Sequence, residues 1–162
     1  MRSSTILILF LLSAGSAYAD KVISTVSMNM KDLDLKKTMD LVIEEHADRL
    51  VIQNSFEKES ETIRAERIFP KDGDFAALYK NIWGKLDLLK TWELKSDPKP
   101  DSLDGMFEVK FHFKRKGQNK ELTAYVNKDG VDPAQPAMSE IGRLFDIPYR
   151  FVTELYTRLV GE

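Results

Sequence analysis

The first half of the chain alternates between apolar and polar residues in four separate runs. These runs lie at residues 22–30, 37–44, 49–56 and 62–69. A period of two is typical of strands that bury one face and expose the other. The connecting segments are short, whereas parallel strands need a crossover of about a dozen residues or more. The pattern therefore predicts an antiparallel meander of four strands.

The apolar period changes to that of a helix after residue 74. The apolar positions are then Phe75, Leu78, Tyr79, Ile82, Leu86 and Leu89. This spacing predicts an amphipathic helix with one apolar face. A carboxylate can accept the free N–H groups of the first turn, so we expect Asp72 or Asp74 to cap the helix. Gly84 disfavours the helix by about 1 kcal/mol relative to alanine, and it predicts either close packing on the sheet or an early break.

A loop at 95–105, which contains two prolines, leads into the clearest strand of the chain, at 106–113. Its apolar face carries Phe107, Val109, Phe111 and Phe113, and its polar face carries Glu108, Lys110 and His112. A turn at 114–119 precedes a second alternating run at 122–126. Two alternating runs around a short glycine-containing turn predict a β-hairpin.

The last part of the chain predicts a closing helix or a pair of helices. Pro136 suits the first helical position, where its missing N–H has no partner to lose, and the helix is expected from Ala137 to Phe145. Asp146 can cap a second helix whose inner face carries Phe151, Val152, Leu155 and Leu159, although one bent helix fits equally well. Strands and helices are segregated along the chain. This order predicts the α+β class, with an antiparallel sheet of about six strands and helices packed on one face.

The N-terminus has the three parts of an export signal. Arg2 gives a positive start, residues 5–12 are apolar, and an Ala-Tyr-Ala sequence ends at Ala19. The apolar run is too short for a membrane-spanning helix, which needs about 20 residues. We therefore expect residues 1–19 to be a cleaved signal peptide, and residues 20–162 to form a single domain in the periplasm or outside the cell.

Composition narrows the possible chemistry. The 162 residues include 24 Lys and Arg, 26 Asp and Glu, and no cysteine, with a formal net charge of -2. The absence of cysteine excludes a disulfide scaffold, a thiolate metal site, a cysteine nucleophile and a lipid anchor at the cleavage site. A nearly neutral chain is also unlike a general nucleic-acid-binding protein, which carries a strong basic excess.

No catalytic or metal-binding motif is assembled in the sequence. There are two histidines, whereas hydrolytic zinc sites usually combine two or three with a carboxylate. The densest set of potential ligands is Glu44, Glu45, His46 and Asp48, which we interpret as a solvated turn. A second set in the proline-rich loop, without the spacing of an EF-hand, is Asp97, Asp101 and Asp104. We therefore predict no metal, no cofactor and no catalytic site, and a carboxylate-based enzyme is the alternative.

Basic residues cluster on the predicted hairpin in an otherwise acidic chain. They are Lys110, Lys114, Arg115, Lys116 and Lys120, with His112 among them. Lysines on a strand commonly protect it from edge-to-edge aggregation. The same residues could contact an acidic protein partner, an anionic membrane surface or a polysaccharide. Trp92 lies past the helical stripe beside a polar loop, so we predict that it is an exposed contact residue.

One arrangement of helix, loop and hairpin runs through the second half of the chain. It comprises a helix ending in Leu88-Leu89-x-x-Trp92, a proline-rich loop with Asp104-Gly105, the strand with Phe107, Val109 and Phe111, a partner strand with Tyr125, and the closing helix. Over roughly residues 50–160 this layout resembles the emfourin-type domains, exported bacterial inhibitors of metallopeptidases. The resemblance implies inhibition of a secreted peptidase, but it transfers no inhibitory residue. The strand at 22–30 and the broken closing helix depart from it.

Together these features predict an exported, non-catalytic binding protein that engages a protein partner in the cell envelope. The first alternative is an inhibitor of a secreted peptidase. The second is a carrier of a small ligand or lipid. The oligomeric state is left open at this point, as is the choice between periplasm and extracellular space.

Overall fold

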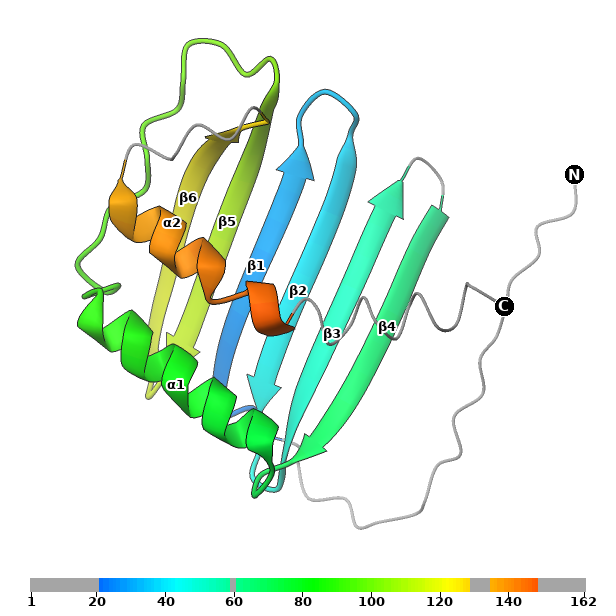
Figure 1. Ribbon diagram of the computed structural model, residues 1–162, viewed down its shortest axis with the longest axis vertical. Helices are drawn as coiled ribbons and strands as arrows, with labels where there is room; N and C mark the ends of the chain where they lie inside the picture. The colour runs from blue at the N-terminus through cyan, green and yellow to red at the C-terminus, as the bar shows by residue number, and fades with distance from the viewer. Residues whose placement is uncertain (1–20, 59–60, 129–134, 149–162) are drawn as a thin grey trace, which may run out of the picture.

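The computed structural model describes residues 21–58, 61–128 and 135–148. The elements in this part of the chain are β1 (Ser24–Asp32), β2 (Lys37–Glu45), β3 (Arg49–Lys58), β4 (Glu61–Pro70), α1 (Asp74–Leu88), β5 (Met106–Arg115), β6 (Gln118–Asn127) and α2 (Pro136–Arg143). Both helices lie against the same face of one sheet (Figure 1). The α+β class with helices on one face is therefore confirmed.

The six strands form one antiparallel sheet in the order β4-β3-β2-β1-β5-β6. The four-stranded meander is confirmed, and the β5–β6 hairpin adds to the free side of β1 rather than to β4. Val26 of β1 consequently lies opposite both Ile43 of β2 and Phe113 of β5. This order places β4 and β6 at the two edges of the sheet.

The face that the helices cover, here called the front face, holds the hydrophobic core. Every second residue of the central strands is buried there, as the alternation predicts. The apolar strand residues with the least exposure are Val26, Leu41, Ile43, Leu50, Ile52, Phe111, Phe113, Leu122 and Ala124. The two helices and the turn after α2 add Phe75, Tyr79, Ile82, Trp83, Leu86, Met138, Ile141 and Phe145. Each such side chain contributes roughly 1.5–3 kcal/mol when it is fully buried.

The opposite face of the sheet, here called the back face, is mainly polar. Asn29 donates a hydrogen bond of 2.6 Å to Asp40, and Ser55 donates one of 3.3 Å to the other oxygen of the same carboxylate. These three residues belong to neighbouring strands and share the back face. An antiparallel sheet with one buried and one solvated face shows this division.

The start of α1 differs from the prediction. Gly73 is the N-cap residue and no side chain caps the helix, so the prediction that Asp72 or Asp74 caps it is wrong. Asp74 instead lies in the first turn, where a negative charge interacts favourably with the helix dipole. Gly84 is exposed inside a helix that continues to Leu88, and a Cβ there would meet no atom within 4 Å. Gly84 therefore marks neither close packing nor a break.

The closing helix is interrupted two residues before its predicted end at Phe145, and Asp146 is itself helical instead of capping a second helix. α2 ends at Arg143, a turn follows at 144–145, and residues 146–148 are helical again. The apolar positions predicted for the second helix, from Phe151 to Leu159, lie outside the described residues. The predicted signal peptide at 1–19 also lies outside them.

A charged cluster fixes the turn between β1 and β2 to the end of β6. The Lys128 ammonium donates to Asp32 and to Asp34, each at 2.7 Å, and the backbone N–H of Leu35 also donates to Asp32. The hydrogen bond from Lys128 is the largest cause that holds the pKa of both carboxyl groups below the ordinary value. Both carboxylates are therefore ionised at neutral pH and join segments far apart in sequence.

The packing of Phe111 yields a stability prediction. Phe111 is 2 % exposed and stacks on both Phe113 and Phe145. Phe111→Ala should lower the free energy of unfolding, measured by urea denaturation, by about 3–5 kcal/mol, because the truncation leaves a cavity in the core. Phe56→Ala is the matched control, since Phe56 is 38 % exposed on the same face. A loss below about 1 kcal/mol for Phe111→Ala would mean that this ring does not support the core.

Candidate functional site

An open cleft lies where α1 crosses the ends of the strands. It has a volume of about 400 Å³ and is lined by Glu45, Leu50, Lys71, Ala76, Tyr79, Lys80, Trp83 and Arg115. Ala76, Tyr79, Lys80 and Trp83 are spaced by three and four residues, so one face of α1 supplies half of the lining. Cavities of roughly 300–1,000 Å³ are typical of small-ligand sites. The cleft is therefore large enough to hold a chemical group.

The register of the sheet brings the polar residues of this region together. Ser24 of β1 lies opposite Glu45 of β2 on one side and opposite Arg115 of β5 on the other. Each of these residues is two positions from a buried core residue of its own strand and therefore lies on the same face of the sheet. The core residues are Val26, Ile43 and Phe113. Three polar side chains consequently lie on the front face at the rim of the core.

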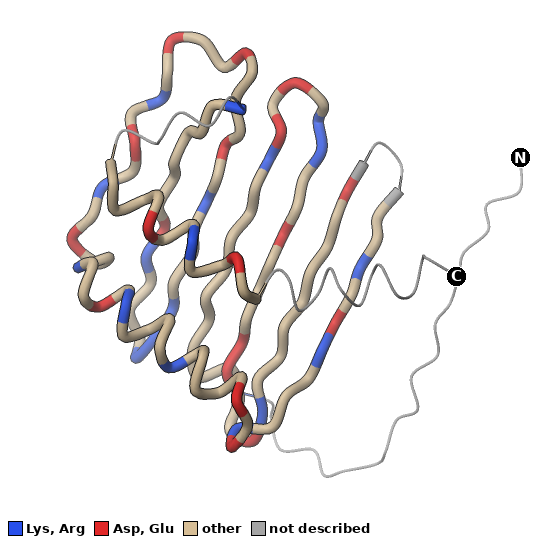
Figure 2. Tube along the Cα trace, viewed as in Figure 1, with Lys and Arg blue, Asp and Glu red and all other residues tan. Residues whose placement is uncertain are grey.

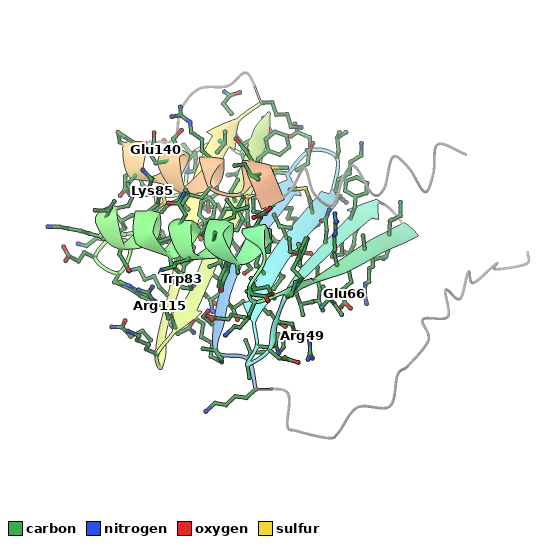
Figure 3. All side chains as sticks on the ribbon, turned by 60° about the horizontal axis from the view of Figure 1, so that its bottom comes forward. Arg49, Glu66, Trp83, Lys85, Arg115 and Glu140 are labelled. Carbon is green, nitrogen blue, oxygen red and sulfur yellow. The ribbon has the colours of Figure 1, made fainter. Side chains whose placement is uncertain are left out.

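Arg115 and Trp83 form one wall of the cleft. The two side chains lie next to each other beside α1 (Figure 3), with the guanidinium carbon 4.3 Å from the centre of the Trp83 ring. Nη2 of Arg115 donates a hydrogen bond of 2.5 Å to Asp87. A cation over an aromatic face is attracted by about 0.5–2 kcal/mol. Trp83 and Asp87 both belong to α1. These contacts therefore attach the helix to the end of β5 and fix the plane of the guanidinium.

A chain of hydrogen bonds forms the inner side of the cleft. The Lys71 ammonium lies 2.9 Å from Oε1 of Glu45, and the Ser24 hydroxyl donates to Oε2 at 2.6 Å. The Ser24 oxygen lies 2.9 Å from the Tyr79 hydroxyl, which donates to it because Ser24 has committed its own proton to Glu45. The buried Ser24 side chain therefore connects the sheet to α1.

Two ionisable groups of this hydrogen-bonded network, Glu45 and Tyr79, have shifted pKa values. Burial alone would raise the pKa of Glu45, but the hydrogen bond from Ser24 and the contact with Lys71 bring it below the ordinary value. Burial raises the pKa of Tyr79 to about 12. At neutral pH Glu45 is therefore a carboxylate and Tyr79 is a neutral hydroxyl.

The cleft carries an excess of positive charge. Its lining holds the cations of Lys71, Lys80 and Arg115 and the carboxylate of Glu45, and Asp87 adds a second carboxylate through its hydrogen bond to Arg115. Lys71 and Arg115 each contact one acid, whereas Lys80 is exposed on the helix. Clustered charge of one sign raises the local concentration of ions of the opposite sign. The arrangement can therefore attract and orient an anionic group.

The structure divides the predicted basic hairpin between the two faces of the sheet. Lys110, His112 and Lys114 belong to the back face, whereas Arg115 and Lys120 belong to the front face. Lys116 occupies the tight turn with a φ of 52°. Figure 2 shows basic residues both along the hairpin and along α1. The six hairpin residues therefore do not form one patch, and Arg115 joins a different group of cations.

The remaining hairpin contacts are local. Lys110 lies 3.0 Å from Glu108 on the same strand, and the His112 ring is hydrogen-bonded to Asn119 across the hairpin. Lys120 donates a hydrogen bond of 3.1 Å to the backbone oxygen of Trp92. The Lys120 ammonium is therefore engaged in fixing the segment after α1.

Trp92 is half-buried and packs against the core. Its ring stacks on Trp83, with 6.4 Å between the ring centres and 11° between the planes. The prediction that Trp92 is exposed is therefore wrong, and its role as a contact residue stays a prediction. Trp92 instead supports Trp83 from the side, and through Trp83 it supports the wall of the cleft.

The first predicted set of ligands does not converge. Glu44 and Glu45 belong to opposite faces, because they are adjacent residues of one strand. His46 is 5 % exposed and its Nε2 lies 3.4 Å from Glu44, so the interpretation as a solvated turn is wrong for the histidine. Throughout the described ranges, no three His, Asp or Glu side chains are placed to hold a metal ion.

The second set of ligands is structural. Asp97 is buried and accepts a hydrogen bond of 3.0 Å from Gln135, the N-cap residue of α2. Its backbone N–H donates to Thr123 of β6 at 2.8 Å. Asp101 and Asp104 are exposed. Asp97 therefore fastens the proline-rich loop between β6 and the start of α2.

Comparisons with known proteins identify no relative. No family model, no curated protein and no solved structure matches the chain. The resemblance to emfourin-type inhibitors therefore stays a prediction. In the part of the chain that the structure describes, no helix has both the length and the apolar character needed to cross a membrane.

The role of Arg115 as a structural link yields a second prediction. Arg115→Ala should lower the free energy of unfolding by about 1–2 kcal/mol, because it removes the stacking on Trp83 and leaves Asp87 without this cation. The control is Lys114→Glu combined with Lys116→Glu, which changes exposed side chains of the same hairpin and should shift stability by less than about 0.5 kcal/mol. Equal losses in a urea titration would show that the contact between Arg115 and Trp83 stabilises nothing.

Proposed function

We propose that this chain is an exported, non-catalytic binding protein that engages a protein partner in the cell envelope, and that its cleft holds an acidic group of that partner. The observation that carries the proposal is the excess of positive charge around a cleft walled by aromatic rings. Lys71, Lys80 and Arg115 supply the charge, and Tyr79 and Trp83 supply the rings.

The chemistry of Arg115 suits a carboxylate. A guanidinium has five N–H donors in a rigid plane, and it binds carboxylates through two parallel hydrogen bonds. The hydrogen bond to Asp87 comes from Nη2, and stacking on Trp83 keeps the plane fixed. A donor that is already oriented loses little conformational freedom when a ligand arrives. Arg115 is therefore the expected anchor for an incoming carboxylate.

The two lysines complete the recognition of charge in different ways. The Lys71 ammonium is paired with Glu45, so a ligand can share only its remaining N–H groups. Lys80 lies on the exposed side of the cleft, and an ammonium on a flexible stem can adapt to the position of an acid. Lys80 is thus the residue whose removal should affect binding without disturbing the fold.

The ionisation of the cleft supports binding rather than catalysis. A general acid or base works best when its pKa is near the operating pH. The pKa of Tyr79 is about 12, and the pKa of Glu45 lies below its ordinary value. Neither histidine lines the cleft. Neither the Glu45 carboxylate nor the Tyr79 hydroxyl is therefore tuned to exchange a proton at neutral pH.

The proposal is tested with a hexaglutamate peptide as the probe and tryptophan fluorescence as the signal. The peptide should bind in a salt-dependent manner, and Lys80→Glu should weaken binding by about three- to tenfold, which corresponds to roughly 0.7–1.4 kcal/mol. Lys85→Glu is the matched control, since Lys85 is an exposed residue of α1 on the side away from Trp83 (Figure 3).

The outcomes answer two separate questions: whether the acidic group belongs to a protein or to a free anion, and whether it binds in the cleft. Binding of inorganic phosphate as tight as that of the peptide would favour a free small anion over a protein partner. Binding of hexalysine in place of hexaglutamate, or equal effects of Lys80→Glu and Lys85→Glu, would contradict the assignment of the cleft.

A further inference from the structure

The outer edge of β4 is a long strand edge that no described residue covers. β4 contains ten residues, is the terminal strand of the sheet, and pairs only with β3 in the part of the chain that the structure describes. Its one proline, Pro70, is the last residue of the strand. An unpaired edge presents a row of N–H and C=O groups that can pair with another strand.

Besides its charged residues, this edge carries large apolar side chains that are partly exposed to solvent. Ile68 is 58 % exposed on the back face, and Ile63 is 37 % exposed on the front face next to Phe56, which is 38 % exposed. Apolar residues on both faces of an open edge would be shielded from water by an added strand. The edge therefore favours a strand as its occupant.

Backbone geometry restricts how a second β4 could pair with this edge. Along a strand, the N–H and C=O groups of alternate residues point to opposite sides, and one set in β4 already bonds to β3. In an antiparallel pair, a residue whose N–H and C=O groups point toward the partner strand lies opposite a residue whose groups point back toward it. Odd-numbered residues of β4 must therefore face odd-numbered residues of the second copy, and even must face even.

Charge then selects one register among those allowed. Two identical strands that pair antiparallel are related by a two-fold axis. If this axis passes between the two copies of Ala65, Arg64 of each copy faces Glu66 of the other, which gives two opposite-charge pairs on the back face. An axis at Arg64 would place two arginines face to face, and an axis at Glu66 would do the same with two glutamates. Directly opposed residues have Cβ atoms about 4.5–5.5 Å apart, so opposite charges favour the axis at Ala65 and like charges disfavour the other two.

Glu66 retains capacity for such a contact. Its Oε2 accepts a hydrogen bond of 2.9 Å from Gln53 of β3, which holds the carboxylate on the back face. A carboxylate accepts through both oxygens, so Oε1 can accept from an arginine of another chain. Arg64 is exposed on the same face. The two residues are thus placed to form reciprocal ion pairs.

We propose that β4 pairs antiparallel with β4 of a second copy of this chain, centred on Ala65, and joins two sheets into one. The pairing of odd with odd residues keeps both front faces on the same side of the joined sheet. The two clefts would then open toward one side, where a partner carrying two acidic groups could bind both. The dimer does not depend on the proposed function of the cleft.

The proposal is tested by sedimentation equilibrium of the purified protein from micromolar to millimolar concentration. The wild type should dimerise. Arg64→Glu and Glu66→Arg should each weaken the dimer by at least about tenfold, because each variant places like charges face to face twice. The combined variant exchanges the two charges and should restore the dimer. Lys99→Glu makes the same change of charge as Arg64→Glu, but in an exposed loop, and should have no effect on the dimer.

Several results would overturn the proposal. These are a wild type that stays monomeric at millimolar concentration, a dimer unaffected by either single reversal, and a combined variant that stays as weak as the singles. Circular dichroism checks that each variant folds. Arg64→Gln removes one charge without reversing it and should weaken the dimer less than Arg64→Glu. It also tests the contact of Arg64 if the reversed variant does not fold.

Discussion

The alignment of Ser24 between Glu45 and Arg115 is the constraint on which the cleft depends. Antiparallel pairing fixes which residues face each other, and the period of two fixes the face to which they belong. Three polar residues are thereby carried onto the face that the helices must cover. A buried polar group without a hydrogen bond costs about 1–3 kcal/mol. Residues of α1 meet this demand, since Tyr79 contacts Ser24, and Trp83 and Asp87 contact Arg115.

The same contacts explain why a cleft forms at this end of the molecule. Between the helices and the central strands, apolar residues of the sheet and the helices pack directly against each other. At the rim, long polar side chains replace them, and a helix cannot pack as closely on charged groups as on Val26 or Ile43. The space that results is bordered by cations, because Lys71 and Lys80 lie on the segments that reach it. Structure and recognition therefore use one set of residues.

The alternation of the strands was sufficient to predict the sheet and its buried face. The cleft was predictable only in part. Continuing the inward phase beyond Val26, Ile43 and Phe113 leads to Ser24, Glu45 and Arg115, which is a signal in the sequence. What the sequence does not contain is the position of α1 over these strand ends, because that position depends on packing between distant segments.

The incorrect predictions about the basic hairpin, Trp92 and His46 also have physical reasons. Lys114 and Arg115 are neighbours in sequence, but adjacent residues of a strand point to opposite faces, so a basic run does not make a basic patch. Trp92 lies in a polar stretch of sequence, yet stacking on Trp83 draws it toward the core. His46 lies in a turn and is buried. For Trp92 a tertiary contact outweighs the local composition, whereas for Lys114 and Arg115 the alternation of the strand itself separates the two side chains.

The central claim is that the cleft, and not the back face of the hairpin, recognises acidic groups. The most direct measurement is the mapping of backbone amide chemical shifts as hexaglutamate is added to the isotopically labelled protein. The account predicts that the largest changes occur around Lys71, Lys80 and Arg115. Changes concentrated around Lys110 and Lys114, with the cleft unaffected, would contradict it.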